Sequence, residues 1–275
     1  VAPAGFSTPT NQREITMTVT APNFGGTTTA RVGEDLQESA SVTLSVAPPG
    51  PVNITITSGN TAVAVVSANG SVLGGASVSI NGVSDTTGNA YFIQATGTAG
   101  LTNDLTLTPP GYNTRTVPVT IDPSGFVEIN QNAAFRTTTF STNTTLNIRS
   151  ARLTAGTLTY AAQQAVRPAG LGLAHPVAVS VTSSNTSAGV ITTSPLSFGA
   201  NVQQISTAFD PLTAGTTTVS IVPPAGFGTP SDHRQMIVTV TAPNITVPAS
   251  LRLGQNLEDS AKLSLSVVPP NPLDI

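Results

Sequence analysis

Apolar and hydroxyl residues alternate in short segments along the whole chain. Successive side chains of a β-strand point to opposite faces of a sheet, so a period of two predicts strands with Val, Leu and Ile in a core and Thr and Ser in water. No segment shows a convincing helical period. The clearest alternating segments are residues 42–46, 52–56, 105–107, 177–181 and 238–241.

Pairs that contain Gly, Pro or Asn separate the alternating segments and predict tight turns between them. Short strands joined by tight turns at this spacing are typical of β-sandwiches, so we predict an all-β fold of immunoglobulin-like sandwiches in tandem. The predicted turns include Gly25-Gly26, Asn69-Gly70, Gly74-Gly75, Asn81-Gly82 and Pro109-Pro110-Gly111.

The end of the chain repeats its beginning. Residues 222–275 align without a gap with residues 1–54 at a constant offset, from Gly33 to Gly254 (254 − 33 = 221). Roughly half of the aligned positions are identical, which is self-similarity at a fixed period. The match includes turns as well as strands, since Pro-Ala-Gly-Phe and Thr-Val-Thr-Ala-Pro-Asn both occur once in each copy.

A second, weaker similarity divides the period in two. Residues 57–63 resemble residues 182–188, and residues 107–112 resemble residues 221–227. Half of the period is close to the length of an immunoglobulin-type sandwich, which has about 100 residues. We therefore predict one module at residues 23–123 and a second at residues 124–244.

The two ends are predicted to be parts of further modules. Residues 1–22 would supply only the final strand of a preceding module, and residues 245–275 the first strands of a following one. An isolated strand such as residues 15–20 would leave a row of backbone groups open to association. We therefore expect either an excerpt of a longer polypeptide or ends that neighbouring copies complete.

Composition excludes several classes of function. Charged residues make up 8 % of the chain and the single lysine is Lys262, so a nucleic-acid partner is not expected. The absence of cysteine excludes disulfides, thiolate metal sites and a cysteine nucleophile. No stretch approaches the roughly 18 apolar residues of a membrane span.

No residues form a recognisable catalytic set, and we predict that the chain is not an enzyme. The two histidines, His175 and His233, have no second metal-type ligand at a known spacing, and the repeat exchanges His233 for Gln12. No Gly-x-Ser-x-Gly motif is present. We therefore predict no catalytic or cofactor-binding residues.

Four scattered carboxylates near predicted turns are candidate ligands for Ca²⁺ between modules, which needs six to eight oxygens. The sequence has no Asp-x-Asp cluster, so the favoured interpretation is that these residues are turn formers and that no metal is bound. The four residues are Asp85, Asp104, Asp122 and Asp210.

Two motifs of the second module carry a resemblance to a known family. One is Val-Thr-Ser-Ser-Asn-Thr at residues 181–186 followed by Val-Ile-Thr at residues 190–192. The other is residues 209–220, where Ala-Gly-Thr precedes an alternating strand, and residues 95–101 hold a degraded version of it. These motifs resemble the bacterial immunoglobulin-like (BIg2-like) tandem repeats of large surface proteins and adhesin stalks.

The resemblance implies a bacterial source, an extracellular or cell-surface location and a structural role with homotypic contacts between modules or copies. We therefore predict a repeat segment that acts as scaffold or spacer in a surface filament or adhesin stalk. The alternative is an adhesin module that binds a glycan or protein ligand through loops at one end of a sandwich. That alternative requires exposed aromatic or Arg anchors.

Six residues are candidates for packing between modules. Phe6 and Phe227 occupy equivalent places in the two Pro-Ala-Gly-Phe turns and are predicted to pack against an adjoining module. The other four lie in Pro-rich segments, which either stiffen connections between modules or mark a kink at an edge strand within a module. These four are Pro48, Pro49, Pro269 and Pro270.

Overall fold

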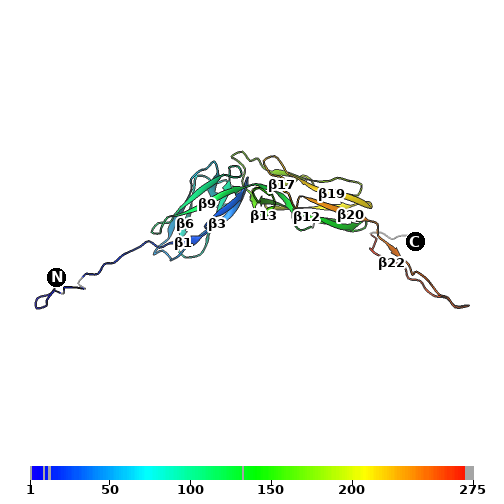
Figure 1. Ribbon diagram of the computed structural model, residues 1–275, viewed down its shortest axis with the longest axis horizontal. Helices are drawn as coiled ribbons and strands as arrows, with labels where there is room; N and C mark the ends of the chain where they lie inside the picture. Colours follow the sequence, from blue (N-terminus) through cyan, green and yellow to red (C-terminus); the bar gives the residue numbers. More distant parts are fainter. Residues whose placement is uncertain (1, 9, 12–13, 132, 270–275) are drawn as a thin grey trace.

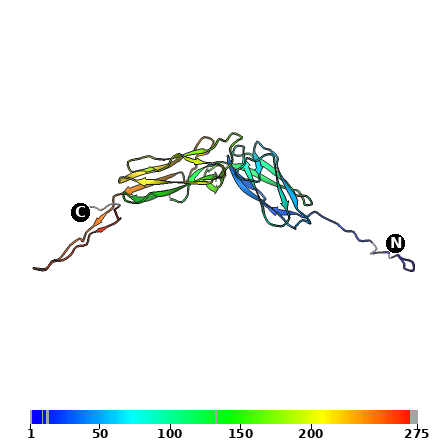
Figure 2. The ribbon, with the colours of Figure 1, turned by 180° about the vertical axis from the view of Figure 1, so that it is seen from behind.

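Two β-sandwiches lie end to end along the chain (Figure 1). This computed structural model describes residues 2–8, 10–11, 14–131 and 133–269. The described residues form strands and no helix, which confirms the all-β prediction. The chain enters the pair of sandwiches at one end and leaves at the other, so the terminal segments lie far apart (Figure 2).

The strands group into the two sandwiches in chain order. The first sandwich contains β1 (Phe24–Gly26), β2 (Ala30–Gly33), β3 (Leu36–Leu44), β4 (Val52–Ser58), β5 (Ala64–Ser67), β6 (Ser77–Val83), β7 (Asn89–Ala95), β8 (Thr102–Thr108) and β9 (Arg115–Asp122). The second contains β10 (Ser124–Glu128), β11 (Ala134–Thr138), β12 (Thr144–Leu153), β13 (Tyr160–Gln163), β14 (Ala165–Val166), β15 (Val177–Ser183), β16 (Gly189–Ile191), β17 (Leu196–Phe198), β18 (Gln204–Pro211), β19 (Gly215–Val222) and β20 (Gln235–Thr241). A terminal pair follows, β21 (Ile245–Thr246) and β22 (Ser264–Leu265).

The two sandwiches share one topology. The sheets of the first have the orders β1-β3-β7-β5 and β2-β9-β8-β4-β6, and those of the second have the orders β10-β12-β18-β16 and β11-β20-β19-β15-β17. Each strand of the first therefore has a counterpart in the second. The correspondence includes the parallel pairs β2 with β9 and β11 with β20. Only β13 and β14 of the second sandwich lack a counterpart among the described strands.

The weaker similarity within the period corresponds to a shared turn. Ser58 ends β4, and its hydroxyl donates to the carbonyl of Ala64 at 2.6 Å. Ser183 ends β15, and its hydroxyl donates to the carbonyl of Gly189 at 2.7 Å. A serine at the equivalent position therefore closes the equivalent connection in each sandwich.

The alternation of residues places one face of each strand in a core. In β8, Leu105 and Leu107 are buried while Thr102, Asp104 and Thr108 are exposed. The first core is mostly aliphatic, with Tyr91 among its buried residues, and the second is built around an aromatic cluster. Removing this apolar surface from water stabilises the fold by about 1.5–3 kcal/mol for each large side chain.

Two of the predicted turns lie inside strands, so those predictions are wrong. Gly25 and Gly26 belong to β1 and pair with β3. Asn81 and Gly82 lie in β6, where the register against β4 shifts and Gly82 has a φ of 72°. An extra residue with a glycine at positive φ is a β-bulge. Glycine is compatible with a turn and with a bulge inside a strand, so the sequence alone does not distinguish the two.

The terminal segments lie outside the two sandwiches. Residues 14–20 form no strand. In the C-terminal pair, Ile245 lies opposite Leu265. One period earlier, Phe24 lies opposite Leu44 in β1 and β3, so both copies begin with the same register.

Candidate functional site at the junction of the sandwiches

A single residue connects the two sandwiches. β9 ends at Asp122, β10 begins at Ser124, and Pro123 lies between them. The proline ring fixes φ, and the carbonyl of Pro123 accepts the N–H of Leu153 at 2.7 Å. The link therefore has little freedom and holds the two ends in contact.

A turn of the first sandwich reaches into the core of the second. Asp35, between β2 and β3, has a left-handed φ of 59°, and the next residue, Leu36, is fully buried. Leu36 belongs to the same apolar cluster as Phe126 and Val166 of the second sandwich. Val166 of β14 also lies opposite Leu36 in an antiparallel pair, so a strand of the second sandwich extends a sheet of the first.

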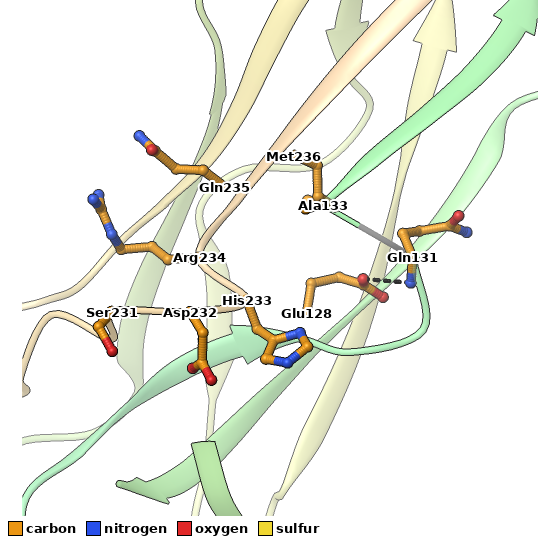
Figure 3. A pocket seen from close by; sticks show the side chains of 9 residues that line it. All are labelled: Glu128, Gln131, Ala133, Ser231, Asp232, His233, Arg234, Gln235 and Met236. Atoms are coloured by element: carbon orange, nitrogen blue, oxygen red, sulfur yellow. Dashed lines mark hydrogen bonds between the residues drawn. The ribbon is translucent and has the colours of Figure 1, made fainter. Parts of the chain in front are cut away.

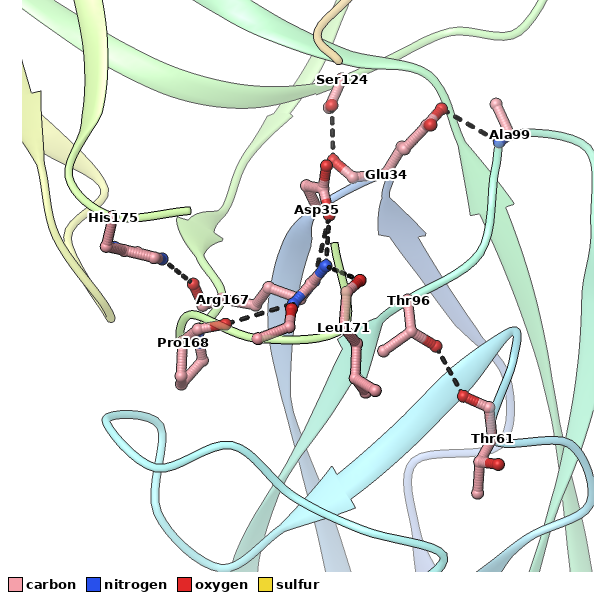
Figure 4. Close-up of polar contacts among 11 residues, drawn as sticks. Glu34, Asp35, Thr61, Thr96, Ala99, Ser124, Arg167, Pro168, Leu171 and His175 are labelled. Carbon is pink, nitrogen blue, oxygen red and sulfur yellow. Dashed lines mark hydrogen bonds and ion pairs between the residues drawn. The ribbon is translucent and has the colours of Figure 1, made fainter. Parts of the chain in front are cut away.

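An ion pair between a buried Arg and a partly exposed Asp closes this contact. Arg167 is fully buried, and its Nη2 and Nε donate to Asp35 Oδ1 at 2.6 and 3.1 Å (Figure 4). Its guanidinium also donates to the carbonyl oxygens of Pro168, Gly170 and Leu171. A charge without partners would be costly at this depth, and the acceptors that satisfy it come from both sandwiches.

The side-chain amide of Gln164 occupies the free edge of β2. Its Nε2 donates to the carbonyl of Arg31 and its Oε1 accepts the N–H of Gly33, both at 2.8 Å. These are the bonds that a neighbouring strand would make. The same Nε2 donates to Glu38 Oε2 at 2.6 Å. Gln164 therefore satisfies a sheet edge that the junction buries.

Asp122 joins cations of both sandwiches. Its buried carboxylate accepts from Arg31 Nε at 2.8 Å in the first sandwich and from Arg152 Nη1 at 2.9 Å in the second. Hydrogen bonds between ionised partners are stronger than neutral ones. Nearby, burial raises the pKa of the Glu38 carboxyl above its usual value, opposed by the hydrogen bond from Gln164 and the charge of Arg152.

Gly33 allows the two backbones to approach. A Cβ atom at this position would lie 2.7 Å from Leu36 Cδ1, 3.0 Å from Ser124 Cβ and 3.3 Å from Arg152 Cα. A side chain here would push the second sandwich away. The glycine recurs one period later as Gly254.

Phe227, predicted to pack between modules, lies in the second core at the side of the junction. Its ring centroid is 4.9 Å from that of Phe126, in the cluster that holds Leu36. The preceding Gly226 faces the first sandwich, because a Cβ atom there would lie 3.6 Å from Asp35 Oδ2. The counterpart of Phe227, Phe6, is exposed.

The prolines predicted to pack between modules lie at other places. Pro48 and Pro49 are in the β3–β4 connection of the first sandwich, where the hydroxyl of Ser45 donates to the carbonyl of Asn23. This is the end of the first sandwich at which the N-terminal segment enters, since Asn23 directly precedes β1. Pro269 is half-buried, and Pro270 lies outside the described residues. Packing of these prolines against a further module stays a prediction.

The candidate calcium ligands are spread over the fold. Asp85 accepts the N–H and hydroxyl of Thr87 in a turn, as predicted for a turn former, and these bonds lower its pKa. Asp104, Asp122 and Asp210 lie in strands, so the turn-former prediction is wrong for them. Among the described residues, no three Asp, Glu or His side chains group as a metal site.

The two histidines of the second sandwich line different cavities. His175 Nε2 is 2.8 Å from the carbonyl oxygen of Arg167 (Figure 4). His233 lines a cavity of about 380 Å³ beside Glu128 (Figure 3). The carboxylate of Glu128 accepts the N–H groups of Asn130 and Gln131 at 3.1 and 2.7 Å, and Arg234 points away from it. These contacts are those of a loop anchor.

Sequence reasoning missed the residues that join the sandwiches. Asp35 and Leu36 carry a signal, because their turn recurs in the second copy with Asn256 and Leu257. Gln164 and Arg167 carry none, since β13 and β14 lack a counterpart in the first sandwich. Their role follows only from the fold.

Comparisons with known proteins give a distant likeness in structure. No protein-family model and no curated protein matches the sequence, so the resemblance to BIg2-like repeats stays a prediction. Domains 4 and 5 of the S-layer protein SbsC are similar with a TM-score of 0.31 and 14 % identity over 69 % of this chain and 77 % of that one. Domains 5–6 of SbsC have a TM-score of 0.30 and 14 % identity, over 80 % of this chain and 99 % of that one. Domains 4–9 have a TM-score of 0.30 and 15 % identity, over 83 % of this chain and 33 % of that one. Values this low decide nothing about function.

Proposed function

We propose that this chain is a structural repeat segment of an extracellular or cell-surface filament or stalk, in which immunoglobulin-like sandwiches act as scaffold or spacer. The junction carries the proposal. Leu36 lies in the core of the neighbouring sandwich, and the buried Arg167 forms an ion pair beside it with the partly exposed Asp35. A spacer gains reach only if its modules hold a fixed orientation, and such contacts restrict the domain motion that is otherwise the default.

The repeat supports an array in which this junction recurs. Asn256 has the same left-handed φ of 59° as Asp35, and Leu257 follows it as Leu36 follows Asp35. In the proposed array, residues 245–275 begin a following module and residues 1–22 end a preceding one. Contacts between modules are then homotypic.

The shared topology supports the immunoglobulin-like description. Each sandwich pairs two mostly antiparallel sheets over one core within about 100 residues, as immunoglobulin-type domains do. In the described residues, no helix is long and apolar enough to cross a membrane.

The orientation of the two sandwiches can be measured directly. The sequence has no cysteine, so exposed Thr57 of β4 and exposed Ser197 of β17 can be replaced by labelled cysteines without background. We expect pulsed electron spin resonance to give one narrow distance distribution between the labels. A broad distribution in the unaltered junction would contradict a rigid spacer.

A matched pair of variants tests whether the junction holds the orientation. Leu36→Ala with Arg167→Met should broaden the distribution, because it removes the inserted side chain and the ion pair. Leu251→Ala with Arg136→Met makes the same changes at exposed positions and should leave the distribution unchanged.

Electron micrographs of native material test the array itself. They should show regular fibres, whereas short separate particles would argue against the array.

A further inference from the structure

Three apolar side chains of the N-terminal segment, residues 3–20, stand in water. Ile15, Met17 and Val19 are 88, 82 and 90 % exposed and alternate with threonines. Alternation of this kind is the pattern of a strand with one buried face. Such a strand without a sheet is a template for pairing with another sheet. The segment therefore lacks the sheet for which its sequence is suited.

The same pattern one period later shows which sheet fits. Met236, Val238 and Val240 of β20 hold the places of those three residues and are 2, 0 and 2 % exposed. β20 lies between β11, to which it is parallel, and β19, to which it is antiparallel. A strand in this place makes backbone bonds on both edges and buries one face.

The outward face of the segment also fits that place. Thr16 and Thr18 correspond to Ile237 and Thr239, and Ile237 is exposed in β20. A shift of the register by one residue would bury the threonines and expose the apolar side chains. The alternation of the segment therefore excludes registers that are shifted by one residue.

The turn before the segment already has the conformation of the turn that precedes β20 in the second sandwich. Gly5 has a φ of 89° and Gly226 a φ of 90°. The N–H of Phe6 donates to the carbonyl of Pro3 at 3.1 Å, and the N–H of Phe227 donates to that of Pro224 at 3.2 Å. Phe6 is nevertheless 75 % exposed, whereas Phe227 is 9 % exposed against the second core.

We propose that residues 3–20 are a docking segment for a sandwich of the second type whose place for the last strand is open. The turn would set Phe6 on the counterpart of Phe126. Residues 14–20 would then add a strand between the counterparts of β11 and β19, a case of β-augmentation. The inference adds a partner to the proposed array, and it does not depend on a rigid junction.

The second sandwich of this chain can serve as the partner once its own strand is disabled. In the full chain, Val238→Asp with Val240→Asp puts two carboxylates at buried positions and should release β20, and Met17→Asp in the same chain disables its own docking segment. The probe is a labelled synthetic peptide of residues 3–22. We expect saturable one-to-one binding to the variant, a rise in its melting temperature, and no binding to the unaltered chain, in which β20 occupies the place.

A control peptide tests the buried face. Met17→Asp in the peptide should weaken binding by at least about tenfold, because it buries a carboxylate where the sequence has an apolar side chain. Equal binding of both peptides would overturn the proposal. If the variant chain is unfolded by itself, the peptide should restore its second sandwich, and failure to restore it would also overturn the proposal.

A disulfide tests the register. Thr239 of β20 lies opposite Thr216 of β19, so Thr18 of the peptide should take that position. Opposite residues of antiparallel strands are at the spacing of a disulfide. A Thr18→Cys peptide should link to Thr216→Cys in the variant chain, and a Thr16→Cys peptide should link much less. Equal disulfide yields from the two peptides would overturn the register. The spin-label distances between the two sandwiches test the proposed array independently of this result.

Discussion

At the scale of single residues, Tyr91 is a polar group that the first core leaves without a partner. Its hydroxyl is buried without a hydrogen bond among the described residues, and burial raises its pKa to about 12. An unsatisfied buried group costs about 1–3 kcal/mol. Tyr91→Phe should therefore raise the free energy of unfolding by about 1 kcal/mol in a denaturant titration.

Tyr112 is the matched control for this prediction. Its hydroxyl donates to the carbonyl of Val46 at 2.5 Å. Tyr112→Phe removes a bond that is made, so it should lower stability by about 1 kcal/mol or less. A loss of stability from Tyr91→Phe would show that its hydroxyl has a partner, for example a buried water.

Glu38 gives the junction a dependence on pH. Burial raises the pKa of its carboxyl in the folded chain, so the folded state binds this proton more tightly than the unfolded state. The contribution of Glu38 to the free energy of unfolding is fully present below the pKa that its carboxyl has in the unfolded chain. It is lost as pH rises through the pKa of the folded chain. At pH 7, Glu38→Gln should therefore stabilise the chain, by less than about 1 kcal/mol because solvent screens a half-buried group.

Melting curves of Glu38→Gln and the unaltered chain at several pH values test this dependence. The difference should shrink as pH falls through the acid range and Glu38 becomes protonated. Asp259→Asn, at the exposed equivalent position one period later, should show no such change. A difference that grows toward low pH would contradict the sign.

At the scale of elements, β3 belongs to one sandwich and stabilises the other. Leu36→Ala should cost about 2–5 kcal/mol, as expected for removing a fully buried leucine. The loss should appear as faster hydrogen exchange in β10 and β17 of the second sandwich, which supply Phe126 and Phe198 to the same cluster. Leu257→Ala, at the exposed equivalent, should change stability by no more than about 0.5 kcal/mol.

The elements also show what the sequence could predict. Alternation located β4, β8, β15 and β20, because a period of two directly reports burial of one face. It did not separate the bulge at Gly82 from a turn, since both need a positive φ. The junction was beyond this reasoning, because Gln164 and Arg167 lie more than a hundred residues along the chain from Gly33 and Asp35, which they contact.

At the scale of the whole molecule, the repeat predicts more than any single motif. The constant offset relates Leu36 to Leu257 and Val240 to Val19, and in each pair the structure buries one member and exposes the other. Where an exposed residue repeats a buried one, its counterpart shows the environment that it lacks. The self-similarity thus indicates where the chain is suited to bind further modules.

The parallel pairs of β2 with β9 and β11 with β20 have a mechanical consequence. Each pair joins a strand near the start of a sandwich to its last strand. Tension applied to the two ends of the chain would slide these strands along each other and load their hydrogen bonds together, instead of opening them one after another. Forced unfolding is governed by the unfolding rate, and hydrogen bonds that must break together make unfolding under tension slow. A chain of such sandwiches is therefore suited to withstand pulling.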